Sequence, residues 1–152
     1  MSHQEKFFAL AQHPFLRGIS TAVLERLLPC TQQMTVSPGQ YLGRVREPAN
    51  AFWLIQSGRV SIELQKSGRE GATLQMLGAG DVVGWSWFVP PHLWQFDARV
   101  LETVRVLNLD AVGLREMCEA DHELGYQIIA RLFKIVVGRL AATRQQLLDQ
   151  SR

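Results

Sequence analysis

The sequence predicts a mainly β protein, an antiparallel jelly roll or β-barrel of about eight strands with flanking helices. Between residues 31 and 109, short segments rich in β-branched and aromatic residues alternate with turn sequences, as in small antiparallel β domains. Before and after this region, the apolar residues follow a helical spacing instead. We therefore expect a single domain, residues 1–152, with N-terminal helices in 1–30, the barrel in 31–109 and C-terminal helices in 110–150.

Two short helices are expected at the N-terminus. The segment EKFFALAQHPFL has the pattern of an amphipathic helix that Pro14 interrupts. In ISTAVLERLLPC, either Ser20 or Thr21 can act as the N-cap, and Pro29 closes the helix.

The expected strands are MTV, QYLGRV, AFWLIQ, GRVSIELQ, ATLQML, DVVGW and ARVLETVRVLNL. They are separated by SPG, REPAN, QSG, KSGREG and LGAG, all of which are typical of turns. Gly39, Gly58 and Gly80 lie in such turns, where a positive φ or a missing side chain is expected. This number and spacing of strands favours a small antiparallel barrel over a parallel sheet.

A long helix is expected near the C-terminus, with Asp121 as its N-cap. A seam of residues recurs along it at alternating steps of three and four, which is typical of a coiled coil. The seam consists of Tyr126, Ile129, Phe133, Val136, Leu140, Thr143 and Leu147. A second apolar stripe accompanies only the first half of the helix and consists of Leu124, Ile128, Leu132 and Ile135.

These two stripes allow two interpretations. In the first, the second stripe packs on the barrel and the seam forms a parallel homodimer with the same helix of a second copy. In the second, both stripes form one broad face toward the core of the same chain. The seam continues to Leu147, farther than one barrel could cover, and this length favours the homodimer.

Composition excludes several classes of protein. The net charge of +2 comes from scattered Lys and Arg without a basic run, so charge gives no sign of nucleic-acid binding. The apolar runs are too short for a membrane span, and the N-terminus lacks the features of a signal peptide. Cys30 and Cys118 follow no metal-binding spacing and are expected to be reduced thiols of a cytoplasmic protein. The histidines and carboxylates form no metal-ligand pattern and no acid–base pair, so neither a metal site nor an enzyme is predicted.

The run SPGQYLGRVREPANAFWLIQSGRVSIEL, followed by LGAGDVVGW, resembles a cyclic nucleotide-binding domain of the catabolite-activator type. The resemblance covers nearly the whole chain, and it implies a ligand site between the barrel and the long helix. In this family, backbone amides, an Arg and a Glu of a phosphate-binding cassette hold the cyclic phosphate and the ribose. The cassette corresponds here to residues 84–98, and the base would contact Ile62 and Leu74.

Two tryptophans stand where the resemblance leads us to expect charged ligand-binding residues. Gly84 keeps the leading glycine, but Trp85 occupies the place of the ribose-binding Glu and Trp94 that of the phosphate-binding Arg. A buried phosphate without its cation would be an unpaired charge, so ordinary binding of cAMP or cGMP is not expected.

A remodelled pocket remains one interpretation of this segment, because indole rings offer flat faces for stacking on a base. The other interpretation is that the tryptophans fill the former cavity. Both stay open on sequence alone. The candidate pocket residues are Ile62, Leu74, Gly84, Trp85, Ser86, Trp87, His92, Trp94, Gln95 and Arg99.

Three functions follow from the resemblance. The first is a non-catalytic, homodimeric sensing or regulatory module that acts in trans on a protein partner and has lost ordinary cyclic-nucleotide binding. The second is a cAMP or cGMP binder that uses Arg99 and backbone amides, and the third is a nucleotide-responsive accessory subunit of a redox complex such as an NAD-linked hydrogenase. A cyclic nucleotide or another nucleotide is thus the implied ligand. Since the chain stops at Arg152 without a helix-turn-helix, direct DNA binding is not expected.

Overall fold

The computed structural model describes residues 2–66 and 69–151, which form two compact units divided between Glu116 and Met117. The expectation of a single domain stays a prediction. The helices are α1 (His3–Gln12), α2 (Thr21–Leu27), the short 3₁₀ helix η1 (Leu28–Cys30), α3 (Ala111–Ala120) and α4 (His122–Gln150). The strands are β1 (Thr31–Val36), β2 (Tyr41–Gly43), β3 (Ala51–Lys66), β4 (Arg69–Leu77), β5 (Val82–Val83) and β6 (Asp97–Asp110).

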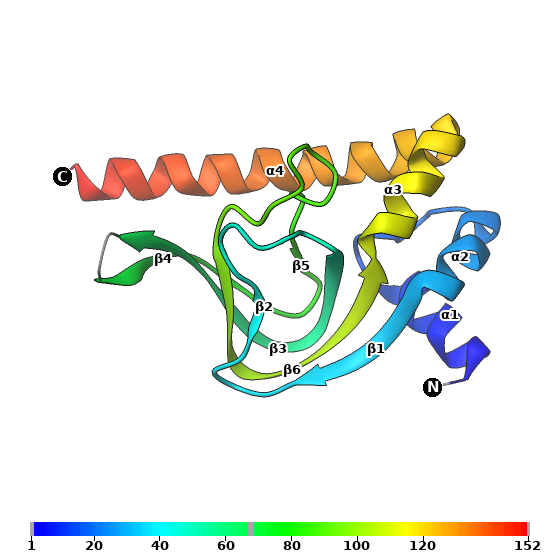
Figure 1. Ribbon diagram of the computed structural model, residues 1–152, viewed down its shortest axis with the longest axis horizontal. Helices are drawn as coiled ribbons and strands as arrows, with labels where there is room; N and C mark the ends of the chain where they lie inside the picture. The colour runs from blue at the N-terminus through cyan, green and yellow to red at the C-terminus, as the bar shows by residue number, and fades with distance from the viewer. Residues whose placement is uncertain (1, 67–68, 152) are drawn as a thin grey trace. The chain divides into compact units, whose positions relative to one another are not determined.

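The first unit is built on an antiparallel sheet in the order β1-β6-β3-β4. β2 pairs with β6, and β5 pairs with β3. Figure 1 shows the two long strands β3 and β6 curving together through the middle of this sheet. The antiparallel β fold with flanking helices is therefore confirmed.

Six strands are present in the described residues, instead of the expected eight or so. The segments AFWLIQ and GRVSIELQ belong to one continuous strand, β3, whose register with β6 shifts around Gly58. Gly58 has φ +98°, and a Cβ atom there would collide with the carbonyl oxygen of Thr103. The glycine therefore marks a bulge within a strand, where the sequence suggested a turn between two strands.

The expected helix boundaries are confirmed at several positions. Ser20, one of the two N-cap candidates, accepts a hydrogen bond from the Val23 amide (3.3 Å), and Pro29 lies in η1 directly after α2. Asp121 caps α4 by accepting hydrogen bonds from the amides of Glu123 (3.1 Å) and Leu124 (3.2 Å).

His13 connects the end of α1 to the central strand β3. Its ring is 4% exposed, Nδ1 accepts a hydrogen bond from the Phe15 amide (3.2 Å), and Nε2 lies 3.0 Å from the Ile55 carbonyl oxygen. Since Nδ1 accepts, Nε2 must carry the proton that is donated to Ile55, so the ring is neutral. Burial lowers the pKa of His13 below its ordinary value of 6.5, against the smaller opposing effects of the Ile55 hydrogen bond and the Asp81 carboxylate.

Acid should therefore destabilise the protein through His13. Because its pKa is lower in the folded than in the unfolded chain, its contribution to stability is complete above about pH 6.5 and is lost as the pH falls through the lowered pKa. We expect the stability advantage of the wild type over His13→Gln, measured by urea denaturation, to shrink between pH 7.5 and pH 5. An advantage that stays constant with pH would contradict this linkage.

α4 is one uninterrupted helix of 29 residues (Figure 1). Along the predicted seam, Tyr126, Ile129, Phe133, Leu140 and Leu147 are exposed, while Val136 and Thr143 are half-buried. In the second stripe, Leu124, Ile128 and Leu132 are buried and Ile135 is half-buried. The two stripes therefore differ in exposure, as the first interpretation requires, and the homodimer itself stays a prediction.

Among the described residues, no helix has the length and hydropathy needed to cross a membrane.

Both cysteines are free thiols, and burial raises the pKa of each to about 11. At neutral pH they are therefore protonated and weakly nucleophilic.

Candidate ligand-binding segment

The segment Gly84–Ala98 leaves β5, makes two turns and returns to the sheet at the start of β6. Gly84 begins it with φ +99°. Three backbone hydrogen bonds then hold the returning half against residues 46–49. They run from the Arg46 amide to the Trp94 carbonyl (2.9 Å), from the Trp94 amide to the Glu47 carbonyl (2.9 Å) and from the Ala49 amide to the His92 carbonyl (2.8 Å).

Trp94 is packed between two glycines. Its indole is 4% exposed, and a Cβ atom built on Gly43 or on Gly84 would lie 2.5 Å or 2.8 Å from the ring. The ring of Phe96 lies 5.7 Å from the Trp94 ring, measured between centroids. The indole therefore fills a space that exists because both neighbours lack a side chain.

Trp87 belongs to the core of the first unit. It is fully buried, and its ring lies 5.3 Å from that of Phe52, which in turn packs edge-on against Phe15. The indole N–H has no hydrogen-bond partner among the described residues, which is costly for a buried donor. The Trp87 carbonyl accepts a hydrogen bond from Arg115 of α3 (2.6 Å), so the segment is tied to that helix.

The other candidates in the segment differ in exposure. Trp85 is half-buried and stands edge-on to Phe96, with the centroids 5.9 Å apart. Ser86 is buried, whereas His92 is half-buried with φ +59°. Gln95 is exposed and donates from its side chain to the Leu93 carbonyl (3.0 Å). Of the three indoles, Trp85 is thus the one with an accessible face.

Ile62 and Leu74, the expected contacts of a base, lie on neighbouring strands. Ile62 is 3% exposed on β3 and is paired with Ala98 of the neighbouring strand β6. Leu74 is half-buried on β4, at the point where the pairing of β3 with β4 shifts register.

Arg99, the nearest arginine to the segment along β6, is paired with Glu63 of β3. Its Nη2 donates to Glu63 Oε2 (2.7 Å), and its Nε lies within 3.3 Å of both carboxylate oxygens. The Glu63 side chain is only 11% exposed, and the hydrogen bonds from Arg99 hold the pKa of Glu63 below its ordinary value. Glu63 is therefore ionised at neutral pH and neutralises the charge of Arg99.

A second buried carboxylate lies beside this pair. Asp97 is 4% exposed and faces Glu63 across the β3–β6 ladder. It accepts hydrogen bonds from the Val45 amide (2.9 Å) and from Gln65 Nε2 (2.8 Å). Two carboxylates and one guanidinium thus lie together at the end of the segment.

The sequence alone did not single out Glu63, Asp97 or Arg115 as residues that shape this region. Glu63 lies in the strand GRVSIELQ, where it looks like the exposed member of an alternating pattern. Its partners become visible only when β3 and β6 are placed in register. Gly43 is a similar case, since only the position of the Trp94 ring explains it.

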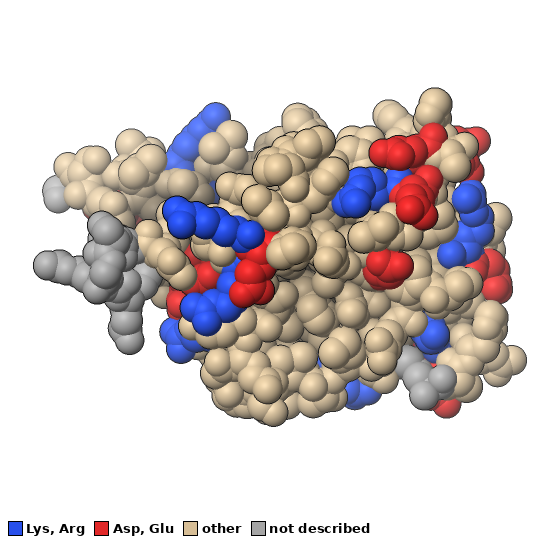
Figure 2. Space-filling view, viewed as in Figure 1, with Lys and Arg blue, Asp and Glu red and all other residues tan. Residues whose placement is uncertain are grey.

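Basic and acidic side chains are also mixed on other parts of the surface. On the face shown in Figure 2, basic and acidic side chains lie next to one another without an extended area of one sign. Within residues 2–66 and 69–151, no group of three or more His, Cys, Asp or Glu residues could hold a metal ion.

The family model of the cyclic nucleotide-binding domain matches residues 33–121. Because this match spans more than half of the chain, the protein belongs to the cyclic nucleotide-binding domain family. Among curated proteins, none matches this chain.

Solved structures with this fold share little sequence with the chain. A cyclic nucleotide-binding protein of Geobacter metallireducens has 22% identity and a TM-score of 0.80, over 92% of this chain and 99% of that one. A cyclic nucleotide-binding domain of Methylobacillus flagellatus has 17% identity and a TM-score of 0.81, over 96% and 84%. The regulatory subunit of a cAMP-independent protein kinase A of Trypanosoma brucei has 24% identity and a TM-score of 0.72, over 87% of this chain and 46% of that one.

Proposed function

We propose that this protein is a non-catalytic, cytoplasmic regulatory module that acts in trans as a homodimer and does not bind cAMP or cGMP in the ordinary way. One observation supports the part of this proposal that concerns cAMP and cGMP. Residues 84–98 contain no Lys or Arg, and the arginine that follows them is held by Glu63 next to a second carboxylate, Asp97.

The physical cost of a phosphate in this setting supports the proposal. A phosphate taken out of water without a compensating cation loses its hydration and gains no ion pair. Arg99 could help only by leaving Glu63, which would then be a largely buried carboxylate without its partner. Asp97 would in addition repel the incoming anion. An anionic cyclic phosphate is thus a poor ligand for these residues.

Part of the indole cluster supports the interpretation that the pocket is filled. Trp87 and Trp94 are packed against Phe52, Phe96 and two glycines, as core residues are. Trp85 remains for recognition, since a half-buried indole can stack on a flat, uncharged ring. One protein of similar fold is the regulatory subunit of a protein kinase A that is described as cAMP-independent, which fits a role without cAMP. The site is therefore best suited to a neutral heteroaromatic ligand or to none.

Isothermal titration calorimetry tests this function directly. We expect no saturable binding of cAMP or cGMP up to about 1 mM, which corresponds to a binding free energy weaker than about −4 kcal/mol. NADH and NADPH, titrated in the same way, test the role in a redox complex, and saturable binding of either would favour that alternative.

The second candidate is a cAMP or cGMP binder that uses Arg99. It predicts that the wild type binds cAMP, and that two substitutions change the affinity in opposite directions. Glu63→Gln removes the charge that competes for Arg99, so it should strengthen cAMP binding. Arg99→Ala should abolish it. Micromolar binding of cAMP by the wild type with both of these effects would overturn the first proposal.

A further inference from the structure

A second strip of residues runs along α4 beside the predicted seam. Its members recur at alternating steps of four and three, so they lie on one side of the helix, and all of them are exposed. Val137 (49% exposed) and Leu148 (59% exposed) are its large apolar residues, and neither belongs to the seam. This flanking strip consists of Ala130, Lys134, Val137, Ala141, Arg144 and Leu148.

The exposed apolar face of α4 is therefore wider than the seam of a two-stranded coiled coil. In the heptad of the seam, Phe133 and Leu140 are at position a, Val136 is at d, and the flanking strip occupies positions e and b. Apolar residues at a and d alone are typical of a coiled-coil seam, whereas apolar residues at a, d and e are typical of a helix in a larger bundle. Val137 is such an e residue. If a second copy covers the seam, the flanking strip is left for another helix.

Charge distinguishes a further copy of this chain from a different protein at the flanking strip. Lys134 and Arg144 give the strip two cations, and residues 124–148 contain no Asp or Glu. A further copy would bring the same two cations, and like charges that face one another oppose association. An acidic helix would bring opposite charges to the flank of the seam, where charged residues decide which helices pair. The strip is therefore complementary to an acidic helix and not to itself.

The small residues of the strip favour a helix over a membrane surface. Ala130 and Ala141 lie between the larger side chains and let the axis of a second helix come close. They offer little apolar surface to lipid, which binds a helix in proportion to the apolar area that it buries. An amphipathic helix that reaches Val137 and Leu148 with its apolar residues and the two cations with its carboxylates fits this pattern.

We propose that the flanking strip binds an acidic amphipathic helix of another protein, which packs its apolar side on Val137 and Leu148 and places Asp or Glu side chains at the two cations. The inference rests on the proposed function, because it names the kind of protein on which the homodimer acts in trans. No residue of the segment Gly84–Ala98 is needed for it.

Two synthetic peptides of about four heptads test the strip on the full chain by fluorescence anisotropy. The acidic peptide has Leu at a, Ala at d and Glu at e and g, and the basic peptide has Lys in place of every Glu. We expect the wild type to bind the acidic peptide at least about tenfold more tightly than the basic one, with a difference that shrinks as salt is raised. Lys134→Glu combined with Arg144→Glu should reverse this preference, which a general loss of folding could not do. Arg44→Glu combined with Arg105→Glu makes the same change of charge at exposed positions outside α4 and should leave the preference unchanged.

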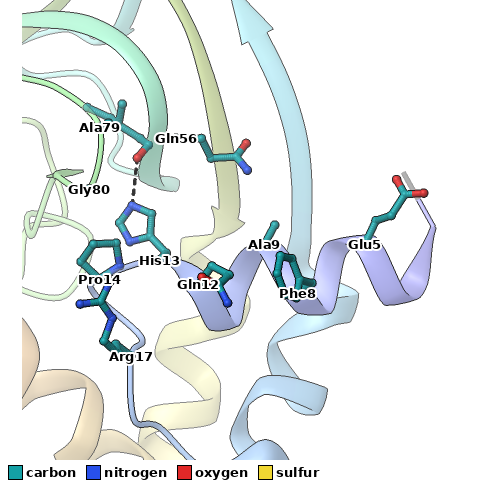
Figure 3. A pocket seen from close by; sticks show the side chains of 11 residues that line it. Glu5, Phe8, Ala9, Gln12, His13, Pro14, Arg17, Gln56, Ala79 and Gly80 are labelled. Carbon is teal, nitrogen blue, oxygen red and sulfur yellow. Dashed lines mark hydrogen bonds between the residues drawn. The ribbon is translucent and has the colours of Figure 1, made fainter.

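The apolar side of the strip has its own test. Val137→Ser combined with Leu148→Ser should weaken binding of the acidic peptide about tenfold or more, while sedimentation equilibrium shows the same dimer as for the wild type. Phe8→Ser is the control, because it removes an exposed aromatic side chain of α1 beside a groove (Figure 3). This variant should bind the acidic peptide as the wild type does.

Sedimentation equilibrium of the protein alone separates this inference from the proposed function. A monomeric wild type would overturn the homodimer and the inference together, whereas a dimeric wild type that binds both peptides alike would overturn the inference alone. The inference is also overturned if the charge-reversed variant keeps the preference of the wild type. A tetrameric wild type that Val137→Ser with Leu148→Ser converts into a dimer would overturn it too, because a further copy would then occupy the strip. Binding to vesicles of phosphatidylglycerol and phosphatidylcholine without binding to the acidic peptide would mean that the strip contacts a membrane, and would overturn it as well.

Discussion

Trp94→Ala is expected to lower the free energy of unfolding by about 3–5 kcal/mol, the usual cost of removing a large buried aromatic side chain. The position offers little room for relaxation, because the indole rests on Gly43 and Gly84, neither of which has a side chain that could move into the space. Urea denaturation monitored by circular dichroism measures the change, provided that the transition stays two-state.

Trp85→Ala is the matched control for this prediction. It removes the same side chain from the same segment, but Trp85 is half-buried, so the loss should stay below about 2 kcal/mol. In Trp94→Ala, added indole should occupy the new cavity and restore part of the stability by mass action. If Trp94→Ala lowers the free energy of unfolding by less than about 1 kcal/mol, this indole does not occupy a tightly packed space. Such a result would support the interpretation of Trp94 as a residue that recognises a ligand.

Local patterns were sufficient to predict much of the fold. The alternation of apolar residues located the strands, and the prolines and capping residues located the helix ends at Ser20 and Asp121. These features depend on neighbours within a few residues of the chain. The number of strands was predicted less well, because Gly58 allows a bulge inside β3 and a glycine in a bulge has the same sequence signature as a glycine in a turn.

The candidate site could be predicted only in part, because its chemistry depends on pairs that are distant in sequence. Arg99 and Glu63 are 36 positions apart, and a shift of one residue in the register of β3 with β6 would move Glu63 to the other face of the sheet. Arg99 therefore looked available for an anion, although its charge is already neutralised. Likewise, the sequence located the tryptophans and Gly84 but not Gly43, the other glycine against which Trp94 packs.

The absence of Lys and Arg from residues 84–98 and the exposed seam of α4 support the same proposed function. If this protein does not bind cAMP or cGMP in the ordinary way, as proposed above, its regulatory role depends on surfaces that other chains can bind. The exposed seam residues on α4 are large and apolar, and exposed apolar patches on proteins commonly mark interfaces. The oligomeric state is therefore the property on which the proposed function depends most.

Combining Phe133→Asp with Leu140→Asp should convert the homodimer into a monomer. Both residues are exposed in the single chain, at 67% and 48%, so the substitutions should not disturb its folding. In a parallel coiled coil they would lie at the seam, where each carboxylate is desolvated and faces the same carboxylate of the second copy. We expect the dimer dissociation constant to rise by about a thousandfold or more, equivalent to about 4 kcal/mol, as measured by sedimentation equilibrium.

The double variant Ala141→Asp with Ala142→Asp adds the same charge to α4, in the turn that follows Leu140, but lies off the seam at exposed positions. It should dimerise nearly as the wild type does, which separates an effect of the seam from an effect of net charge. A monomeric wild type would remove the homodimer from the proposed function. Equal dissociation of both double variants would instead indicate an interface that is sensitive to charge but not built on this seam. The parallel coiled coil is supported only if Phe133 and Leu140 are needed and the two alanines are not.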